Sequence, residues 1–187
     1  MADITAVILD DHEKFRRKFA ELDELSDPDE LAKAWKPLAE LLDVHAAAEE
    51  AVFYPELVQR GSGAEEETTD AVGDHNEIRD AVHDAARHPV GSAEWHKAVR
   101  AARVANSNHM AEEEDDALPD FRVHADPGLR KELGRRFLEF KEEHPGARGL
   151  DTSDVNPQQY VRDVAAGLQR TSDDPSLGIG SLKGVSK

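Results

Sequence analysis

The chain has 187 residues, no cysteine, few aromatic residues (5%) and a formal net charge of −17. The absence of cysteine excludes a disulfide scaffold, a thiolate metal site and an iron–sulfur cluster. Because basic residues are interspersed among acidic ones, a nucleic-acid surface is not expected. No stretch approaches roughly 18 consecutive apolar residues, so no membrane span is expected either. The N-terminus lacks the basic and then apolar pattern of a signal peptide, so we expect a cytoplasmic protein.

Helix-forming residues dominate the composition, and apolar residues at helical spacing predict a first helix over about 3–25. A second helix is predicted over about 28–60, with Asp27 as its N-cap and a proline in its first turn. Pro37 and Pro55 lie inside this second span, and a kink or local bulge is expected near each of them.

Three further long helices follow in the chain, over about 64–87, from Ser92 to just before Pro119, and over about 127–143. The chain after residue 145 is rich in Gly, Pro, Ser and Asp, and only a short amphipathic helix over about 157–169 is predicted there.

Four long helices joined by short breaks predict an all-α fold, an up-down-up-down four-helix bundle within residues 1–122. An additional packing helix is expected within 123–145. The remaining residues, 146–187, are expected to form an extended or mobile tail that contains the short helix.

Each of the four bundle helices carries a polar, metal-capable residue in the middle of its apolar stripe. The first and third helices each offer one histidine, and the second and fourth each offer a histidine followed four residues later by a glutamate: His12, His45 with Glu49, His75, and His109 with Glu113. Residues four apart lie on one face of a helix, so both members of such a pair can reach the same point.

Burying four imidazoles and two carboxylates in an apolar core would be costly without partners. A bound metal removes this cost, and a mixture of imidazole and carboxylate suits iron or manganese, with glutamates able to bridge two cations. One buried histidine alone is more often a hydrogen-bonded core residue. Four at matching depth, two of them paired with a glutamate, indicate a metal site.

The order H…HxxxE…H…HxxxE, in the segments DDHEKFR, HAAAEEAVFYP, DHNEIRD and HMAEEEDDALP, resembles the hemerythrin-like (HHE) cation-binding proteins over about residues 5–120. This resemblance implies a hemerythrin-like bundle that holds two iron ions as an Fe–O–Fe centre. The four histidines would be terminal ligands, and Glu49 and Glu113 would bridge the irons. Ferritin-like di-iron bundles use Glu-x-x-His instead, and that pattern is absent from this sequence.

The sequence departs from the oxygen-carrying hemerythrins at Arg79, where those proteins have a second histidine on the third helix. Three residues are candidates to replace that ligand. His83 lies about 12 Å along the helix from His75 and is expected at the surface. Glu50 is rotated by about 100° from Glu49 and is expected to be solvated or to support the site from outside the ligand set.

Tyr54 is the third candidate. On a straight helix it would lie about 140° from Glu49, which argues against ligation. A distortion at Pro55, the backward lean of helical side chains and the affinity of phenolate for ferric iron argue for it, and we include Tyr54 among the predicted ligands. Arg79 could pair with a carboxylate near the site or extend to solvent, and the second interpretation is favoured.

Other histidines and the tryptophans have no predicted role in the site. The histidines are expected at the surface (His88, His96, His124 and His144), and the tryptophans in the core at one end of the bundle (Trp35 and Trp95).

A phenolate in place of a neutral imidazole favours ferric iron. The expected function is therefore reaction with small oxidants at a diferric centre, either catalase-like decomposition of H₂O₂ or oxidation of NO. The alternative is a sensor or carrier that binds O₂ or iron without turnover. The expected partners are O₂, H₂O₂ or NO, and the sequence leaves the oligomeric state open.

Overall fold

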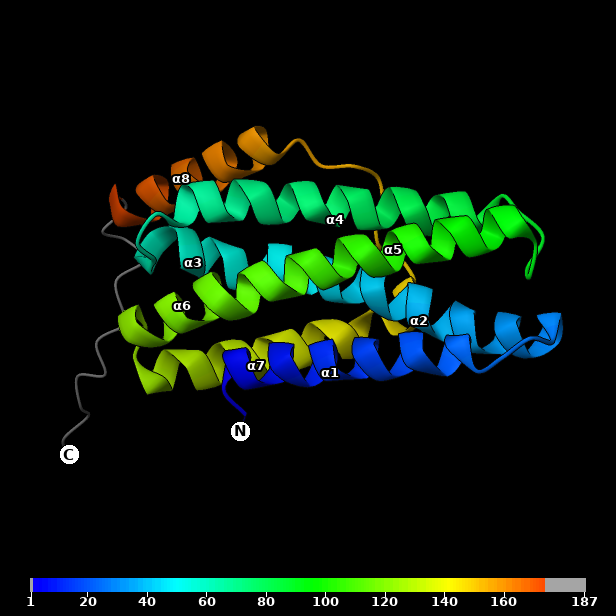
Figure 1. Cartoon of the computed structure of the whole chain (residues 1–187). Coiled ribbons are helices and arrows are strands. Elements are labelled where there is room, and N and C mark those ends of the chain that lie inside the picture. The colour runs from blue at the N-terminus through cyan, green and yellow to red at the C-terminus, as the bar shows by residue number, and fades with distance from the viewer. Residues whose placement is uncertain (1, 174–187) are drawn as a thin grey trace, which may run out of the picture.

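The computed structural model describes residues 2–173, with side chains through residue 167, and every regular element in this part of the chain is helical. Four helical rods lie side by side and form an up-down-up-down bundle (Figure 1). They are α1 (Ile4–Asp23), α2 with η1 and α3 (Pro28–Ala48, Glu49–Phe53, Tyr54–Arg60), α4 (Ala64–Ala86), and α5 with η2 and α6 (Ala93–Glu112, Glu113–Ala117, Leu118–His124). The predicted fold class is confirmed.

Two further helices lie outside the four rods. Helix α7 (Pro127–Glu143) runs beside α1 and also contacts α2, while α8 (Pro157–Asp173) lies over α3 and α4 (Figure 1). A short 3₁₀ turn, η3 (Pro145–Ala147), begins the connection between them. The predicted short helix is therefore present and longer than expected. The extended end of the predicted tail, residues 174–187, lies outside the described residues.

Helix starts are fixed by side chains that accept hydrogen bonds from free backbone N–H groups. Asp27 caps α2 as predicted, with its carboxylate 3.0 Å from the Asp29 N–H. Ser92 caps α5 and Asp126 caps α7 in the same way. These local signals explain why the breaks between helices could be placed from the sequence.

Two rods contain a π-helical segment, η1 in the second and η2 in the fourth. In a π-helical segment each backbone N–H donates to the carbonyl five residues earlier, instead of four as in an α-helix. Each turn therefore contains one extra residue, and the rod continues beyond it. The prediction that the fourth helix ends before Pro119 is therefore wrong. After η2 a new α-helix begins, and Pro119 lies in its first turn, where a missing N–H is tolerated. At Pro37, by contrast, α2 continues as α-helix and no bulge forms.

The core consists of two apolar clusters, one toward each end of the bundle. One contains Phe53, Phe121 and Phe137, and the other contains Phe15 and the two tryptophans. Trp35 and Trp95 are buried and pack edge to face, as expected for the core at one bundle end. Between the two clusters every rod contributes polar side chains, which leaves a polar layer at mid-height in the bundle.

Among residues 2–173, none of the helices combines the length and the apolar character that crossing a bilayer requires.

Helix α7 approaches the N-terminal segment so closely that only a glycine fits at position 134. A Cβ atom there would lie 2.2 Å from the Ala2 carbonyl oxygen. We expect Gly134→Ala to lower the free energy of unfolding by about 1–3 kcal/mol, because α7 or the N-terminus must shift. Urea unfolding followed by circular dichroism measures this change.

Gly73 provides the matched control for this prediction. It lies within α4, where an added Cβ would meet nothing within 4 Å. Gly73→Ala should stabilise the protein by about 0.5–1 kcal/mol through reduced backbone entropy in the unfolded chain. Equal effects of the two substitutions would contradict the close approach of α7.

Candidate metal centre

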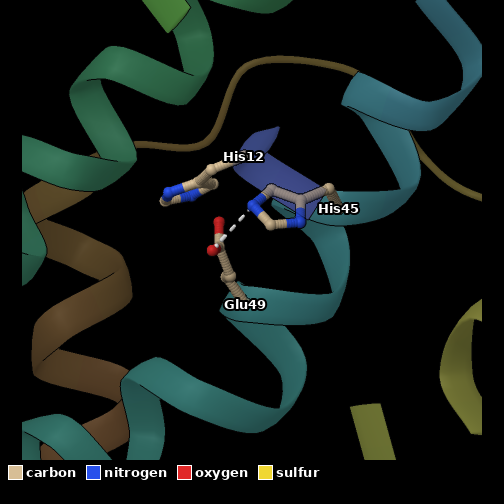
Figure 2. A group of neighbouring side chains, drawn as sticks. All are labelled: His12, His45 and Glu49. Atoms are coloured by element: carbon tan, nitrogen blue, oxygen red, sulfur yellow. Dashed lines mark ion pairs between the residues drawn. The ribbon is translucent and has the colours of Figure 1, made fainter. Parts of the chain in front are cut away.

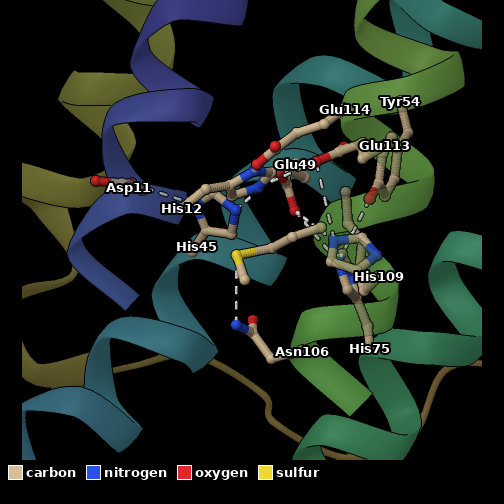
Figure 3. Close-up of polar contacts among 12 residues, drawn as sticks. Asp11, His12, His45, Glu49, Tyr54, His75, Asn106, His109, Glu113 and Glu114 are labelled. Atoms are coloured by element: carbon tan, nitrogen blue, oxygen red, sulfur yellow. Dashed lines mark hydrogen bonds and ion pairs between the residues drawn. The ribbon is translucent and has the colours of Figure 1, made fainter. Parts of the chain in front are cut away.

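The six histidine and glutamate side chains predicted as ligands meet in the polar layer, and each is at most 4% exposed. They come from all four rods and point toward one another (Figure 3). The helical stripes place them there, because each residue continues the apolar face that its helix turns toward the bundle axis.

One group of candidate ligands joins α1 and the second rod. His12, His45 and Glu49 each offer an atom, and these atoms lie within 4.8 Å of one another (Figure 2). Glu49 Oε1 lies 2.9 Å from His45 Nε2. We refer to this group as the His12/His45 half of the centre.

A second group joins the second rod to α4 and α5. Glu49, His75 and His109 offer atoms that also lie within 4.8 Å of one another. Glu49 Oε2 is 3.2 Å from His75 Nε2 and 3.8 Å from His109 Nε2. We refer to this group as the His75/His109 half. Since Glu49 directs one oxygen to each half, it has the geometry of a bridging carboxylate.

Glu113 also reaches both halves. Its Oε2 lies 3.3 Å from His12 Nε2 and 3.9 Å from His109 Nε2. The two glutamates thus lie between two pairs of histidines, which is a donor set for two neighbouring cations.

Six of the inward-facing atoms have charged neighbours but make no hydrogen bond within the described part of the chain, whereas His75 Nε2 and His109 Nε2 lie within hydrogen-bond distance of each other. His12 Nε2, His45 Nε2 and all four carboxylate oxygens of Glu49 and Glu113 are buried without a hydrogen-bond partner. Buried polar atoms without partners are costly and uncommon. Cations between the two histidine pairs would satisfy these atoms, so the residues present fit a pair of metal ions.

Each ligand histidine directs its other ring nitrogen, Nδ1, to a carboxylate. The four pairs are His12 with Glu114 (2.8 Å), His45 with Asp11 (3.2 Å), His75 with Glu50 (2.8 Å) and His109 with Asp74 (3.7 Å). Metal-binding histidines commonly have such partners, because the carboxylate fixes the ring orientation and makes the inner nitrogen a better ligand.

Cations support three of these carboxylates. Arg16 binds Glu114 at 2.6 Å, Lys14 binds Asp11 at 2.8 Å, and Lys141 of α7 also contacts Asp11. The Arg79 guanidinium lies 2.8 Å from Glu50 Oε1, the same oxygen that contacts His75. Arg79 is only 2% exposed. The interpretation of Arg79 as reaching solvent is therefore wrong. The Glu50 carboxylate offers a charged partner inside the bundle, and pairing there outweighs hydration of the guanidinium.

The supporting residues belong to a repeat whose His-x-x-x-Glu part is shared by the second and fourth rods and was recognised from the sequence, while its supporting acidic and basic residues were not. The pattern Asp-His-x-x-x-Arg occurs at 11–16 and 74–79, and His-x-x-x-Glu-Glu-x-x-x-x-Pro occurs at 45–55 and 109–119. In both copies the Asp contacts the histidine of the next rod. The second Glu contacts the histidine of an Asp-His-x-x-x-Arg pattern and is itself bound by the Arg of that pattern. The two halves are thus built alike, and the repeat is the sequence signal that could have identified Asp11, Arg16, Asp74 and Glu114.

Without metal, the centre is held together by charge. Burial alone would lower the pKa of His45, but Glu49 and Asp11 outweigh it and raise the pKa to about 9. In the same way Asp74, Glu49 and Glu113 raise the pKa of His109 to about 10 against the effect of burial. Burial would raise the pKa of the Glu49 carboxyl, yet the neighbouring histidines hold it well below its usual range.

Tyr54 lies against the His75/His109 half. It is fully buried, its hydroxyl is 3.3 Å from His75 Nε2, and its ring stacks on the imidazole. The π segment explains this position, because the Tyr54 N–H donates to the Glu49 carbonyl and the wider turn brings the two residues toward one face. Burial, together with Glu49 and Glu113, raises the pKa of the Tyr54 hydroxyl well above its usual value. The equivalent position in the other copy of the repeat is Leu118.

The remaining histidines are not among the residues of the centre. His83 contacts Thr152 at 3.2 Å and is partly buried. His124 is exposed, whereas His88, His96 and His144 are partly buried and so less exposed than expected.

A cavity of about 140 Å³ between α4 and the α5–η2 rod reaches the His75/His109 half. Tyr54, His109 and Glu113 form part of its wall. The rest is mostly acidic, with Glu67, Asp70, Ala71, Asp74, Glu112, Asp116 and Ala117. The cavity gives small molecules a route to one half of the centre.

The bundle and its paired histidine–glutamate groups define a metal-binding four-helix protein. A family model described as "Hemerythrin HHE cation binding domain" matches residues 3–121, and the chain belongs to this family. The chain matches no curated protein.

Among solved structures, the chain is similar to "Hemerythrin HHE cation binding domain-containing protein: Rv2633c homolog from Mycobacterium kansasii". The two chains share 19% sequence identity with a TM-score of 0.65, and the match covers 90% of this chain and 93% of the other. At this level of identity the likeness concerns the fold.

Proposed function

We propose that the chain binds two iron ions and reacts with small uncharged molecules, either decomposing H₂O₂ to water and O₂ or oxidising NO with O₂ as the oxidant. The observation that carries this proposal is the pair of histidine groups that share Glu49, with Tyr54 beside only one of them. One ion would lie between His12 and His45 and the other between His75 and His109. Glu49 and Glu113 would link the two ions.

The donor set suits iron or manganese, and iron is the metal that we propose. It combines four imidazoles with two carboxylates and contains no thiolate, a combination that suits iron or manganese better than structural zinc. When bound, the iron pair would accept electrons from one substrate molecule and pass them to another: to a second H₂O₂ in peroxide decomposition, or to O₂ when NO is oxidised. The protein supplies a buried polar layer and four carboxylates that hold the histidines in place.

Tyr54 directs the proposal toward oxidant chemistry. Its hydroxyl lies 3.3 Å from His75 Nε2, the nitrogen that would bind the second iron. A metal cation at that point would favour the phenolate, against the raised pKa of the metal-free protein. Phenolate is a good ligand for ferric iron and favours this oxidation state over the ferrous state that carries O₂.

The acidic wall of the cavity favours the same class of substrate. Asp70, Asp74 and Asp116 lie along the route to the His75/His109 half. A passage lined with negative charge attracts cations and repels anions. Uncharged H₂O₂, NO and O₂ can pass without this penalty, and ferrous ions are drawn inward during loading.

Stopped-flow mixing of the iron-loaded protein with H₂O₂ tests the activity. We expect O₂ evolution over many turnovers, with one O₂ released for every two H₂O₂ consumed. Reversible formation of a stable oxygenated spectrum without turnover would contradict the proposal and favour a carrier or sensor of O₂.

The role of Tyr54 has its own test. A ferric phenolate gives a charge-transfer band in the visible spectrum, and this band should be absent from iron-loaded Tyr54→Phe. Persistence of the band in that variant would show that Tyr54 is not a ligand. Tyr160→Phe changes the chain's only other tyrosine; because Tyr160 is not a candidate ligand, this variant should still show the band when it is fully loaded with iron.

A further inference from the structure

The C-terminal appendage, which comprises η3, the connection after it and α8 (residues 145–173), makes a hydrogen bond to the π segment that carries Glu49. Tyr160 of α8 lies outside the family-matched residues 3–121, and its hydroxyl donates to the backbone carbonyl of Glu50 at 2.5 Å. Glu50 belongs to η1, the π segment that also carries Glu49. Its carboxylate contacts both His75 and Arg79.

The Glu50 carbonyl needs a donor from outside its own helix. In a π-helix a carbonyl accepts from the N–H five residues later, and Tyr54 N–H accordingly donates to the Glu49 carbonyl. The corresponding partner of the Glu50 carbonyl would be residue 55, which is proline and has no N–H. A carbonyl left unpaired beneath a packed helix is costly. The Tyr160 hydroxyl supplies the missing donor.

The appendage is anchored at the helical turn that carries His75. The Asn76 side chain donates to the Val155 carbonyl at 2.8 Å and accepts from the Val155 N–H at 2.9 Å. Further along α4, His83 contacts Thr152. Helix α8 packs on α3 and α4. Since α4 carries His75, the appendage lies beside the His75/His109 half of the centre.

We propose that Tyr160 is a positioning residue for this half. Its hydroxyl fixes the π turn, the fixed turn holds the Glu50 carboxylate, and that carboxylate orients His75 through Nδ1, 2.8 Å away. The inference rests on the two-metal centre proposed above. If Tyr160 has this role, the C-terminal appendage supports the metal centre and affects only the metal position between His75 and His109.

Tyr160→Phe tests this inference, because it removes the hydroxyl and keeps the ring. We expect one of the two iron equivalents to leave about 10-fold faster when a ferrous chelator is added to the reduced protein, while the other leaves at the wild-type rate. In the metal-free protein, amide hydrogen exchange should increase across residues 49–54 and stay unchanged across 113–118. The exchange measurement is independent of iron binding and of any activity.

Two further variants make the result specific. Pro55→Ala restores an N–H five residues after Glu50, so the double variant Pro55→Ala/Tyr160→Phe should regain slow iron release and slow exchange. Asp163→Asn changes an exposed residue of α8 that contacts Gln159, and should affect neither measurement.

Unchanged exchange and release in Tyr160→Phe would overturn the inference, as would equal acceleration of both iron equivalents. Fast iron release and fast exchange in the double variant Pro55→Ala/Tyr160→Phe would also overturn the inference. Such a result would mean that the unpaired Glu50 carbonyl is not the cause of the changes in Tyr160→Phe. Absence of peroxide or NO chemistry in the wild-type protein would remove the proposed activity and leave these results standing.

Discussion

Glu49→Gln is expected to empty both halves of the metal centre. Glu49 is the residue shared by the two groups of candidate ligands, with one oxygen 2.9 Å from His45 Nε2 and the other 3.2 Å from His75 Nε2. A glutamine amide has one oxygen and carries no charge, so it cannot bridge two cations. We expect the affinity for both ions to fall by at least about 100-fold, beyond the effect typical of a supporting residue.

Metal analysis and a visible spectrum of the purified variant measure this loss. Glu56→Gln is the matched control, because Glu56 lies on the same rod and pairs with Arg60 near the surface. Metal-free Glu49→Gln should remain folded, since the change removes a buried carboxylate and retains the shape of the side chain. Two iron ions per chain in Glu49→Gln would rule out the shared-carboxylate arrangement.

Metal affinity is expected to rise steeply with pH between about 7 and 9. In the metal-free protein the pKa of His45 is raised to about 9 and that of His109 to about 10, so both imidazoles carry a proton at neutral pH. A metal binds the neutral imidazole, and each of these protons must leave on binding. Release of about two protons gives a slope of about two in the logarithm of affinity against pH.

Stability of the metal-free protein should change in the opposite direction. A histidine whose pKa is raised by folding stabilises the native state fully below its unfolded pKa of about 6.5, and this contribution is lost as pH rises through the folded value. The metal-free protein should therefore lose stability between pH 6.5 and the folded pKa values of about 9 for His45 and about 10 for His109.

Thermal unfolding of metal-free and loaded protein across this range, with competitive metal titrations, checks both trends. His83→Gln changes a histidine outside the centre and serves as the control. A flat affinity profile would show that His45 and His109 are neutral before metal binds.

Features that depend on neighbouring residues along the chain were predictable. The apolar stripes of the four rods, the Asp27 cap and the histidine–glutamate spacing all follow from helical geometry. The same stripes place His12, His45, His75 and His109 at one depth, so the grouping of the ligands could be expected before the structure was known.

The position of the Arg79 side chain could not be predicted from the sequence of its own helix. Whether a long cation pairs inside the bundle or extends to solvent depends on what the neighbouring helix presents at that height. Here it is Glu50, whose carboxylate accepts both Arg79 and the Nδ1 of His75. Likewise Glu114 meets His12 across 102 residues of sequence, a contact that only packing creates.

The sequence by itself determined the four helices, their caps and the six buried side chains that make this chain a metal-binding bundle, because each follows from contacts within one or two turns. Tertiary packing decided the rest. It placed a carboxylate behind every ligand histidine, continued the fourth rod past Pro119 through a π turn, and brought Tyr54 and Tyr160 to the same half of the centre. The contacts among these side chains form only when separate helices pack, so the pattern within one helix does not show which groups meet.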